Sequence, residues 1–251
     1  EYYRVLGGLY RYAIGRDFAA TSPLPTDIPK LPPPLTPYIY SVDELKRLLV
    51  ATDTLQTPLS PLRAMTMRSL LLLLYGTGMR IGEALSLTLK DVDLEERLLT
   101  VRDTKFYKTR LVPIGPRLTM ALADYLSRRR RLPLPEGEAS AFLAACTGIR
   151  LDYKRVNKLF CRLRKAAGVR RESAARYPPR IHDIRHAAVV HRVIAWYRAG
   201  ADVQRLLPQL ATYLGHVDIA STQHYLSMTP ELLQEASLRF ERYAQSEVLH
   251  A

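Results

Sequence analysis

The stretch PLRAMTMRSLLLLLYGTGMRIGEAL, residues 61–85, contains the longest unbroken apolar run of the chain, Leu70 to Tyr75. From Pro61 to Tyr75 it is apolar nearly all round a helical wheel, and this pattern predicts a helix in the centre of a core. Gly76-Thr-Gly78 predicts the end of that helix, because glycine accepts the left-handed conformation common at helix ends. A short helix beginning near Arg80 should follow.

The patterns on either side indicate more helices and one hairpin. Ser41-Val-Asp-Glu44 has the spacing of a capping box and predicts a helix through Val50. Two short strands, 97–103 and 110–114, are separated by a polar turn and predict an antiparallel hairpin with a basic tip. Helices are expected over 117–130, 153–167, 183–199, 203–214 with a break at Pro208, and 230–245. The predicted fold class is therefore mainly α with a small antiparallel β-sheet.

The division into domains follows from the prolines. Residues 1–14 have the pattern of the end of a helix, and the proline-rich stretch 15–39 predicts an extended linker. One main domain, 40–251, remains. An apolar run of this length is far too short to cross a bilayer, so no membrane partner is expected. The chain begins with Glu1 rather than Met, which suggests that an upstream segment has been removed.

The charge of the chain indicates its partner. There are 37 Lys plus Arg against 24 Asp plus Glu, a formal net charge of +13. Between Arg150 and Arg192, 13 basic residues face only 3 acidic ones. Such a local excess favours a polyanion, with nucleic acid first and an anionic membrane surface second. The two cysteines have no metal-ligand spacing and suit a reducing cytoplasm.

Two motifs suit the cleavage of a phosphodiester without a metal. Such cleavage needs a nucleophile, cations on the phosphate oxygens and a proton donor for the leaving oxygen. His182 and Arg185 are one helical turn apart, so both can face one phosphate. The pair Gly215-His216 is followed nine residues later by Tyr225. His182-Asp-Ile-Arg-His superficially mimics a zinc-binding HExxH helix, but Asp183 is shorter than the required Glu and a cation would lie beside the metal, so no metal is expected.

Taken in order, four motifs resemble the tyrosine recombinase (phage integrase) family. They are Gly76-Thr-Gly-Met-Arg80-Ile-Gly-Glu83, the basic hairpin ending Arg110-Leu-Val-Pro113, HDIRH, and Leu214-Gly-His216 with a downstream tyrosine. The resemblance extends over roughly 40–235, and residues 1–14 resemble the last helix of the family's N-terminal core-binding domain. It implies a C-shaped clamp around double-stranded DNA and a homotetramer on two paired sites. It implies neither metal nor nucleotide cofactor.

The resemblance also implies the reaction of the candidate catalytic residues. Tyr225 would attack the phosphate and form a 3′-phosphotyrosine, with His182 accepting its proton. Arg80 and Arg185 would hold the non-bridging oxygens with their fork-shaped donors. The free phenol has a pKa of about 10, so it needs this assistance at neutral pH.

Supporting roles follow from the same resemblance. Lys105 would protonate the leaving 5′-oxygen, because its distance from Arg110-Leu-Val-Pro113 matches the family pattern, although Thr104 and Phe106 stand where the family usually has glycines. Lys108 is the competing lysine. His216 would donate a hydrogen bond to the phosphate, and Glu83 would orient Arg80. Candidate DNA contacts are Lys108, Arg110, Lys154, Arg155, Lys158, Arg162 and Arg180.

Several alternatives remain open at this level. The same site would serve a type IB topoisomerase-like or telomere-resolving enzyme. A DNA-binding regulator that is catalytically silent would retain the fold without the reaction. The apolar stripe of the last helix suits packing on its own core or on a neighbouring protomer; it comprises Leu232, Leu233, Ala236 and Phe240. The segment between Arg185 and His216 is longer than the usual pattern, so its helix is expected to be split. The resemblance implies a DNA strand-exchange enzyme of a mobile element. It would act in the cytoplasm, associate with the nucleoid when bound to DNA, and be assisted by DNA-bending proteins.

Overall fold

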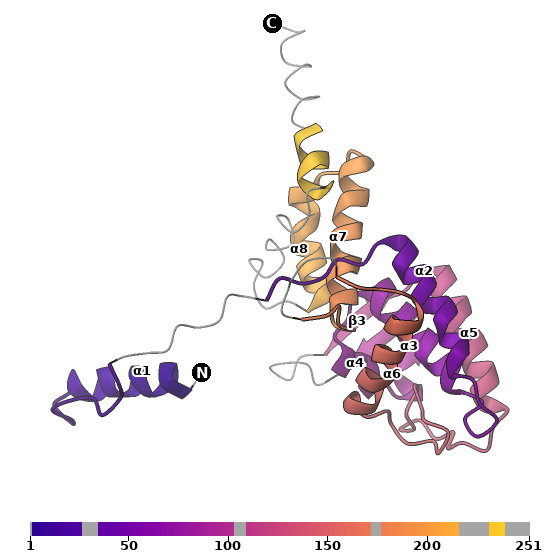
Figure 1. Ribbon diagram of the computed structural model, residues 1–251, viewed down its shortest axis with the longest axis horizontal. Coiled ribbons are helices and arrows are strands. Elements are labelled where there is room, and N and C mark those ends of the chain that lie inside the picture. Colours follow the sequence, from indigo (N-terminus) through magenta and orange to yellow (C-terminus); the bar gives the residue numbers. More distant parts are fainter. Residues whose placement is uncertain (1, 27–34, 103–108, 172–176, 216–230, 239–251) are drawn as a thin grey trace, which may run out of the picture. The chain divides into compact units, whose positions relative to one another are not determined.

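The computed structural model describes residues 2–26, 35–102, 109–171, 177–215 and 231–238 (Figure 1). The chain divides into two compact units, 1–36 and 37–251. In the first, the predicted helix is present as α1, Tyr2–Ile14, and the Tyr3 hydroxyl donates a hydrogen bond to the Pro25 carbonyl at 2.7 Å. No residue of α1 is buried within its unit.

The second unit contains the remaining elements, and its mainly helical character with a small sheet confirms the predicted fold class. No helix within the described residues is both long and apolar enough to cross a membrane. The helices are α2 (Val42–Ala51), α3 (Arg63–Thr77), α4 (Ile81–Ser86), α5 (Pro116–Arg130), α6 (Tyr153–Ala166), α7 (Asp183–Arg198) and α8 (Val203–Leu214), with 3-10 turns η1 (Thr52–Leu55) and η2 (Leu89–Asp91). The strands are β1 (Val92–Asp93), β2 (Leu98–Val101) and β3 (Arg110–Pro113).

Helix α3 is central, as its sequence predicts. Leu70, Leu73 and Leu74 are almost completely buried, and α5 and α7 pack against the helix. It ends at Gly78, whose left-handed φ of 63° closes the last turn. The predicted capping box is also present at α2, where the Ser41 hydroxyl accepts from the Glu44 amide.

The hairpin is confirmed, with one addition. Strands β2 and β3 are antiparallel, with Leu99 opposite Val112. Strand β1 adds to the other side of β2, in the order β1-β2-β3. Its two residues are too few to show the alternation by which a sequence predicts a strand. The tip of the hairpin, with Lys105 and Lys108, lies outside the described residues.

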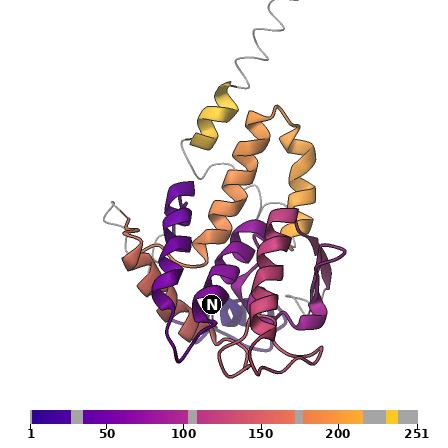
Figure 2. The same ribbon diagram turned by 90° about the vertical axis from the view of Figure 1, so that its right-hand side faces the viewer.

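Helices α7 and α8 lie side by side and enclose a second apolar cluster (Figures 1 and 2). The predicted break at Pro208 is wrong, because α8 continues through this residue. A proline removes one helical hydrogen bond. The burial of Leu207, Leu210 and Leu214 on the same face as Val203 offsets that loss.

Residues 231–238 are helical and contact α7 through charges and one leucine. Leu232 is 1 % exposed in the second apolar cluster, so this part of the last helix packs on its own core, whereas Leu233 is 54 % exposed. Arg198, the last residue of α7, forms ion pairs with Glu231 at 2.7 Å and Glu235 at 2.8 Å. Phe240, the other large residue of the predicted stripe, lies outside the described residues.

Candidate active site

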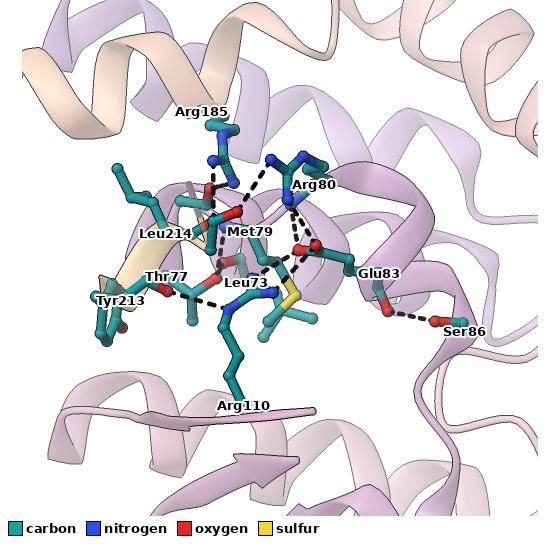
Figure 3. Close-up of polar contacts among 12 residues, drawn as sticks. Leu73, Thr77, Met79, Arg80, Glu83, Ser86, Arg110, Arg185, Tyr213 and Leu214 are labelled. Atoms are coloured by element: carbon teal, nitrogen blue, oxygen red, sulfur yellow. Dashed lines mark hydrogen bonds and ion pairs between the residues drawn. The ribbon is translucent and has the colours of Figure 1, made fainter. Parts of the chain in front are cut away.

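The ends of α3 and α8 together form a cradle of backbone carbonyls for two arginines (Figure 3). The buried Arg185 donates to the Gly78 carbonyl at 2.6 Å and the Leu214 carbonyl at 3.0 Å. Arg80 donates to the Gly215 carbonyl at 3.2 Å. Carbonyls at helix C-termini carry partial negative charge, so they stabilise guanidinium groups there.

Both helix ends require glycine. Gly78 and Gly215 have φ of 63° and 68°, in the left-handed region. A Cβ at Gly78 would lie 2.8 Å from Leu214 Cδ2, and one at Gly215 would lie 2.7 Å from Arg110 Nη1. Any side chain at either position would therefore clash inside the cradle as well as strain the backbone.

Arg80 is fixed from the other side by Glu83. Arg80 caps α4, and its backbone amide donates to Glu83 Oε2 at 2.9 Å. Its guanidinium donates to Oε1 of the same carboxylate at 3.0 Å, while the side chain stays 36 % exposed. The Arg80 side chain is thus held in one orientation by Glu83 and remains partly exposed.

Glu83 also holds Arg110, which arrives from β3 (Figure 3). Arg110 binds both carboxylate oxygens, at 3.1 and 2.7 Å, and donates to the Tyr213 carbonyl at 3.2 Å. Burial alone would raise the pKa of Glu83, but its hydrogen bonds to the two arginines outweigh burial and lower it. Glu83 is therefore an anion shared by two cations.

Arg110 was expected to contact DNA, but its side chain is only 13 % exposed and its guanidinium is bound to Glu83. A basic residue beside a basic hairpin tip gives no sign of a buried partner 27 positions earlier. The sequence therefore did not indicate that Arg110, on strand β3, is connected to the arginine cradle through Glu83.

The interaction of Glu83 with Arg110 should be energetically strong. We expect a double-mutant cycle with Glu83→Gln and Arg110→Gln, measured by urea unfolding, to give a coupling free energy of about 2 kcal/mol. Glu83→Gln leaves the buried Arg110 without its anion, and Arg110→Gln leaves the buried Glu83 paired with Arg80, which is more exposed. The exposed pair Lys90 and Glu138 is the matched control, with an expected coupling of at most about 1 kcal/mol. Equal coupling in the two cycles would contradict the assignment of Glu83 and Arg110 as a buried pair.

His182 is at the start of α7, next to the arginines. Burial lowers its pKa, and the charges of Arg185 and Arg180 lower it further. A lowered pKa favours the neutral imidazole, which is the form that can accept a proton. Arg180, a candidate DNA contact, forms an ion pair with Asp183 at 2.7 Å and is 38 % exposed.

The packing around His186 makes stability depend on pH. Burial, the neighbouring His182 ring and Arg185 lower the pKa of His186 from 6.5 to about 4. The unfolded chain therefore binds a proton that the folded chain does not, and stability present above the unfolded pKa is lost as the pH falls toward about 4. As the pH falls from about 7 to about 5, we expect protonation of His186 in the unfolded chain to lower the free energy of unfolding by up to about 2 kcal/mol. Urea unfolding should show a shallower pH dependence for His186→Gln, and identical slopes would contradict this.

The structure therefore brings together three predicted residues, Arg80, His182 and Arg185. Glu83 forms an ion pair with Arg80. Four others, Lys105, Lys108, His216 and Tyr225, lie outside the described residues. The candidate DNA contacts on α6 are all exposed; they are Lys154, Arg155, Lys158 and Arg162.

Comparison with known proteins gives a consistent result. The model of the phage integrase family matches residues 40–231. A Sinorhizobium fredii protein named as an integrase/recombinase, y4rB, is 39% identical over 92% of this chain and 74% of its own length. Tyrosine recombinase XerC 2 of Ralstonia nicotianae is 35% identical over 83% of this chain and 54% of its own length. This chain thus spans between about half and three quarters of these relatives.

Solved structures agree on the fold. The crystal structure of XerA recombinase has a TM-score of 0.63 at 25% identity and covers 95% of this chain, with 75% of that chain matched. The Tn1549 transposon integrase in complex with a circular intermediate DNA has a TM-score of 0.64 at 20% identity, covering 93% of this chain and 75% of that chain. The family model matches most of this chain, and the relatives that are more than 30% identical are named as integrases or tyrosine recombinases. The chain therefore belongs to the phage integrase family of tyrosine recombinases.

Proposed function

We propose that this chain cuts and rejoins double-stranded DNA at specific sites through a 3′-phosphotyrosine, and that its arginine cradle binds the scissile phosphate. The observation that carries this proposal is the convergence of Arg80 and Arg185, held by carbonyls from two helix ends, near His182 at the start of α7. Two fork-shaped cations are suited to the equatorial oxygens of a phosphate in its transition state.

In the proposed reaction, the Tyr225 oxygen attacks phosphorus and the bond from phosphorus to the 5′-oxygen breaks. The phenol proton passes to His182, and Lys105 supplies a proton to the departing 5′-hydroxyl. His216 donates a hydrogen bond to the phosphate. Rejoining is the reverse attack by a 5′-hydroxyl, so the phosphodiester bond energy is conserved and no nucleotide is consumed.

The proposed partners of the chain are double-stranded DNA and further copies of the same chain. XerH recombinase is solved bound to its difH substrate, and the Tn1549 integrase is solved with transposon end DNA. By analogy we place double-stranded DNA on the basic face of α6, at the Lys154 and Lys158 positions, and propose a homotetramer on paired sites, aided by DNA-bending proteins and acting at the nucleoid. In keeping with the prediction from the sequence, residues 1–14 are proposed as the last helix of a core-binding domain and 40–251 as the catalytic domain.

A covalent-capture experiment tests the proposal without assuming any target sequence. A library of nicked duplexes with randomised sequence is incubated with the chain, and DNA that stays attached after denaturation in detergent is sequenced. A nick next to the cleavage position lets the 5′-hydroxyl fragment diffuse away, so the covalent intermediate accumulates. We expect capture of a defined sequence.

Other results would favour other functions. Binding of duplex DNA without any capture would indicate a silent regulator. Relaxation of a supercoiled plasmid that carries no paired sites would indicate topoisomerase-like activity instead.

A further inference from the structure

The end of α8 presents three consecutive backbone carbonyls, and each accepts a hydrogen bond from a different arginine. The pairs are Tyr213 with Arg110 at 3.2 Å, Leu214 with Arg185 at 3.0 Å, and Gly215 with Arg80 at 3.2 Å. Partial negative charge at a helix C-terminus stabilises such a group of cations. Arg80 and Arg185 are the proposed phosphate ligands, and Arg110 is the third arginine at the same helix end.

The burial of Arg110 separates its role from that of Arg80. The Arg80 side chain is 36 % exposed, whereas that of Arg110 is 13 % exposed. Each side-chain nitrogen of Arg110 already has an acceptor within the protein: Nε donates to the Tyr213 carbonyl, and Nη1 and Nη2 donate to Glu83. An effect of Arg110 on a bound phosphate would therefore be exerted through a neighbouring residue.

Glu83 is the neighbour that connects Arg110 to Arg80 (Figure 3). Its Oε1 accepts from Arg80 Nη1 at 3.0 Å and from Arg110 Nη1 at 3.1 Å. Its Oε2 accepts from the Arg80 backbone amide at 2.9 Å and from Arg110 Nη2 at 2.7 Å. Each carboxylate oxygen thus accepts one hydrogen bond from each arginine. Since the Glu83 side chain is only 9 % exposed, the charges around it interact more strongly than they would in water.

The balance of charge in this group depends on Arg110. Glu83 and Arg80 alone would form a pair without net charge, which is well oriented but attracts a phosphate weakly. With Arg110 the group contains two cations and one anion, so one positive charge remains. The more exposed of the two cations is Arg80, so this charge is available on the accessible side of the group.

We propose that Arg110 is a positioning residue for Arg80: it neutralises Glu83, so that this carboxylate orients Arg80 without cancelling its charge at the scissile phosphate. The inference rests on the proposed function, because it requires that Arg80 binds that phosphate. The strand that carries Arg110 is itself fixed, since the Tyr213 hydroxyl donates to the carbonyl of Pro113, the last residue of β3, at 3.0 Å.

Single-turnover cleavage of the captured sequence by the full chain, at saturating DNA, tests this role. Arg110→Gln removes the cation and should slow cleavage about tenfold or more, a smaller loss than removal of a donor that touches the phosphate. Adding Glu83→Gln removes the uncompensated anion, so the double variant should cleave about threefold or more faster than Arg110→Gln. Arg110→Lys keeps the positive charge and should stay within about fivefold of the unchanged chain.

Arg102→Gln is the matched control. Arg102 directly follows β2 in the same hairpin and forms an ion pair with the largely buried Asp91 at 2.6 Å. Within the described part of the chain, neither residue hydrogen bonds to an arginine of the cradle. Its substitution also leaves a carboxylate uncompensated, but cleavage should stay within about threefold of that of the unchanged chain. Urea unfolding verifies that each variant is folded under the conditions of cleavage.

The outcomes separate this role from the proposed function. A purely structural Arg110 predicts a double variant that is no faster than Arg110→Gln, and an Arg110→Lys that is as slow as Arg110→Gln. Either result overturns the positioning role and leaves the proposed function intact, as does an equal effect of Arg110→Gln and Arg102→Gln. If the glutamine variants do not fold, Arg110→Lys decides, and a loss greater than about tenfold overturns the role. Absence of cleavage by the unchanged chain overturns the proposed function and this inference together.

Discussion

Tyr225→Phe should abolish covalent capture of nicked DNA while leaving DNA affinity within about twofold of that of the unchanged chain. The phenol oxygen is the atom that becomes bonded to phosphorus, and phenylalanine has none, so no intermediate can form. Denaturing gels of a nicked duplex measure capture, and fluorescence anisotropy at low salt measures binding. Affinity of either protein should fall steeply with salt, since binding to phosphates releases counterions.

The control for this substitution is another tyrosine next to the cradle. Tyr213 is half-buried and its hydroxyl donates to the Pro113 carbonyl at 3.0 Å, so it is engaged in the fold. Tyr213→Phe removes one hydrogen bond and should cost about 1 kcal/mol of stability while capture persists. Capture that survives in Tyr225→Phe and disappears in Tyr213→Phe would show that the nucleophile is not Tyr225.

Arg185→Lys should lower the single-turnover cleavage rate by about 10³-fold, within the range seen when one preorganised donor to a transition-state oxyanion is removed. Arg185 is 3 % exposed and uses Nη1 and Nη2 on two different carbonyls. A guanidinium has five donors in a rigid plane, so it can bind these carbonyls and still face a phosphate, whereas an ammonium cannot span both. Quenched-flow cleavage of the captured sequence measures the rate.

Stability must be separated from chemistry in this experiment. We expect Arg185→Lys to lower the free energy of unfolding by about 1–3 kcal/mol, because one buried carbonyl loses its donor. Arg164→Lys is the matched control, since Arg164 also donates to a carbonyl, that of Pro179 at 2.7 Å, but lies outside the cradle. It should keep cleavage within about threefold at a similar cost in stability. If Arg185→Lys retains cleavage to the same extent, Arg185 does not bind the scissile phosphate.

Local patterns were sufficient for most of the secondary structure. The capping box at Ser41 and Glu44, the apolar helix α3 and its stop at Gly78 are determined within a few residues, and the structure confirms them. Pro208 shows where such reasoning fails, because a proline predicts a break only when nothing opposes it. Here the apolar face of α8 is buried on α7, and that tertiary packing outweighs one lost hydrogen bond.

By itself, the sequence determined the family, the order of its motifs and the identities of the candidate catalytic residues, because these depend on residue types at recognisable spacings. Only the tertiary structure decided what holds them. Arg110 is bound to Glu83, and Arg185 to the carbonyls of Gly78 and Leu214, across separations of 27, 107 and 29 residues. The strength of such contacts depends on burial and on the direction of helix ends, and these arise only when distant segments pack together.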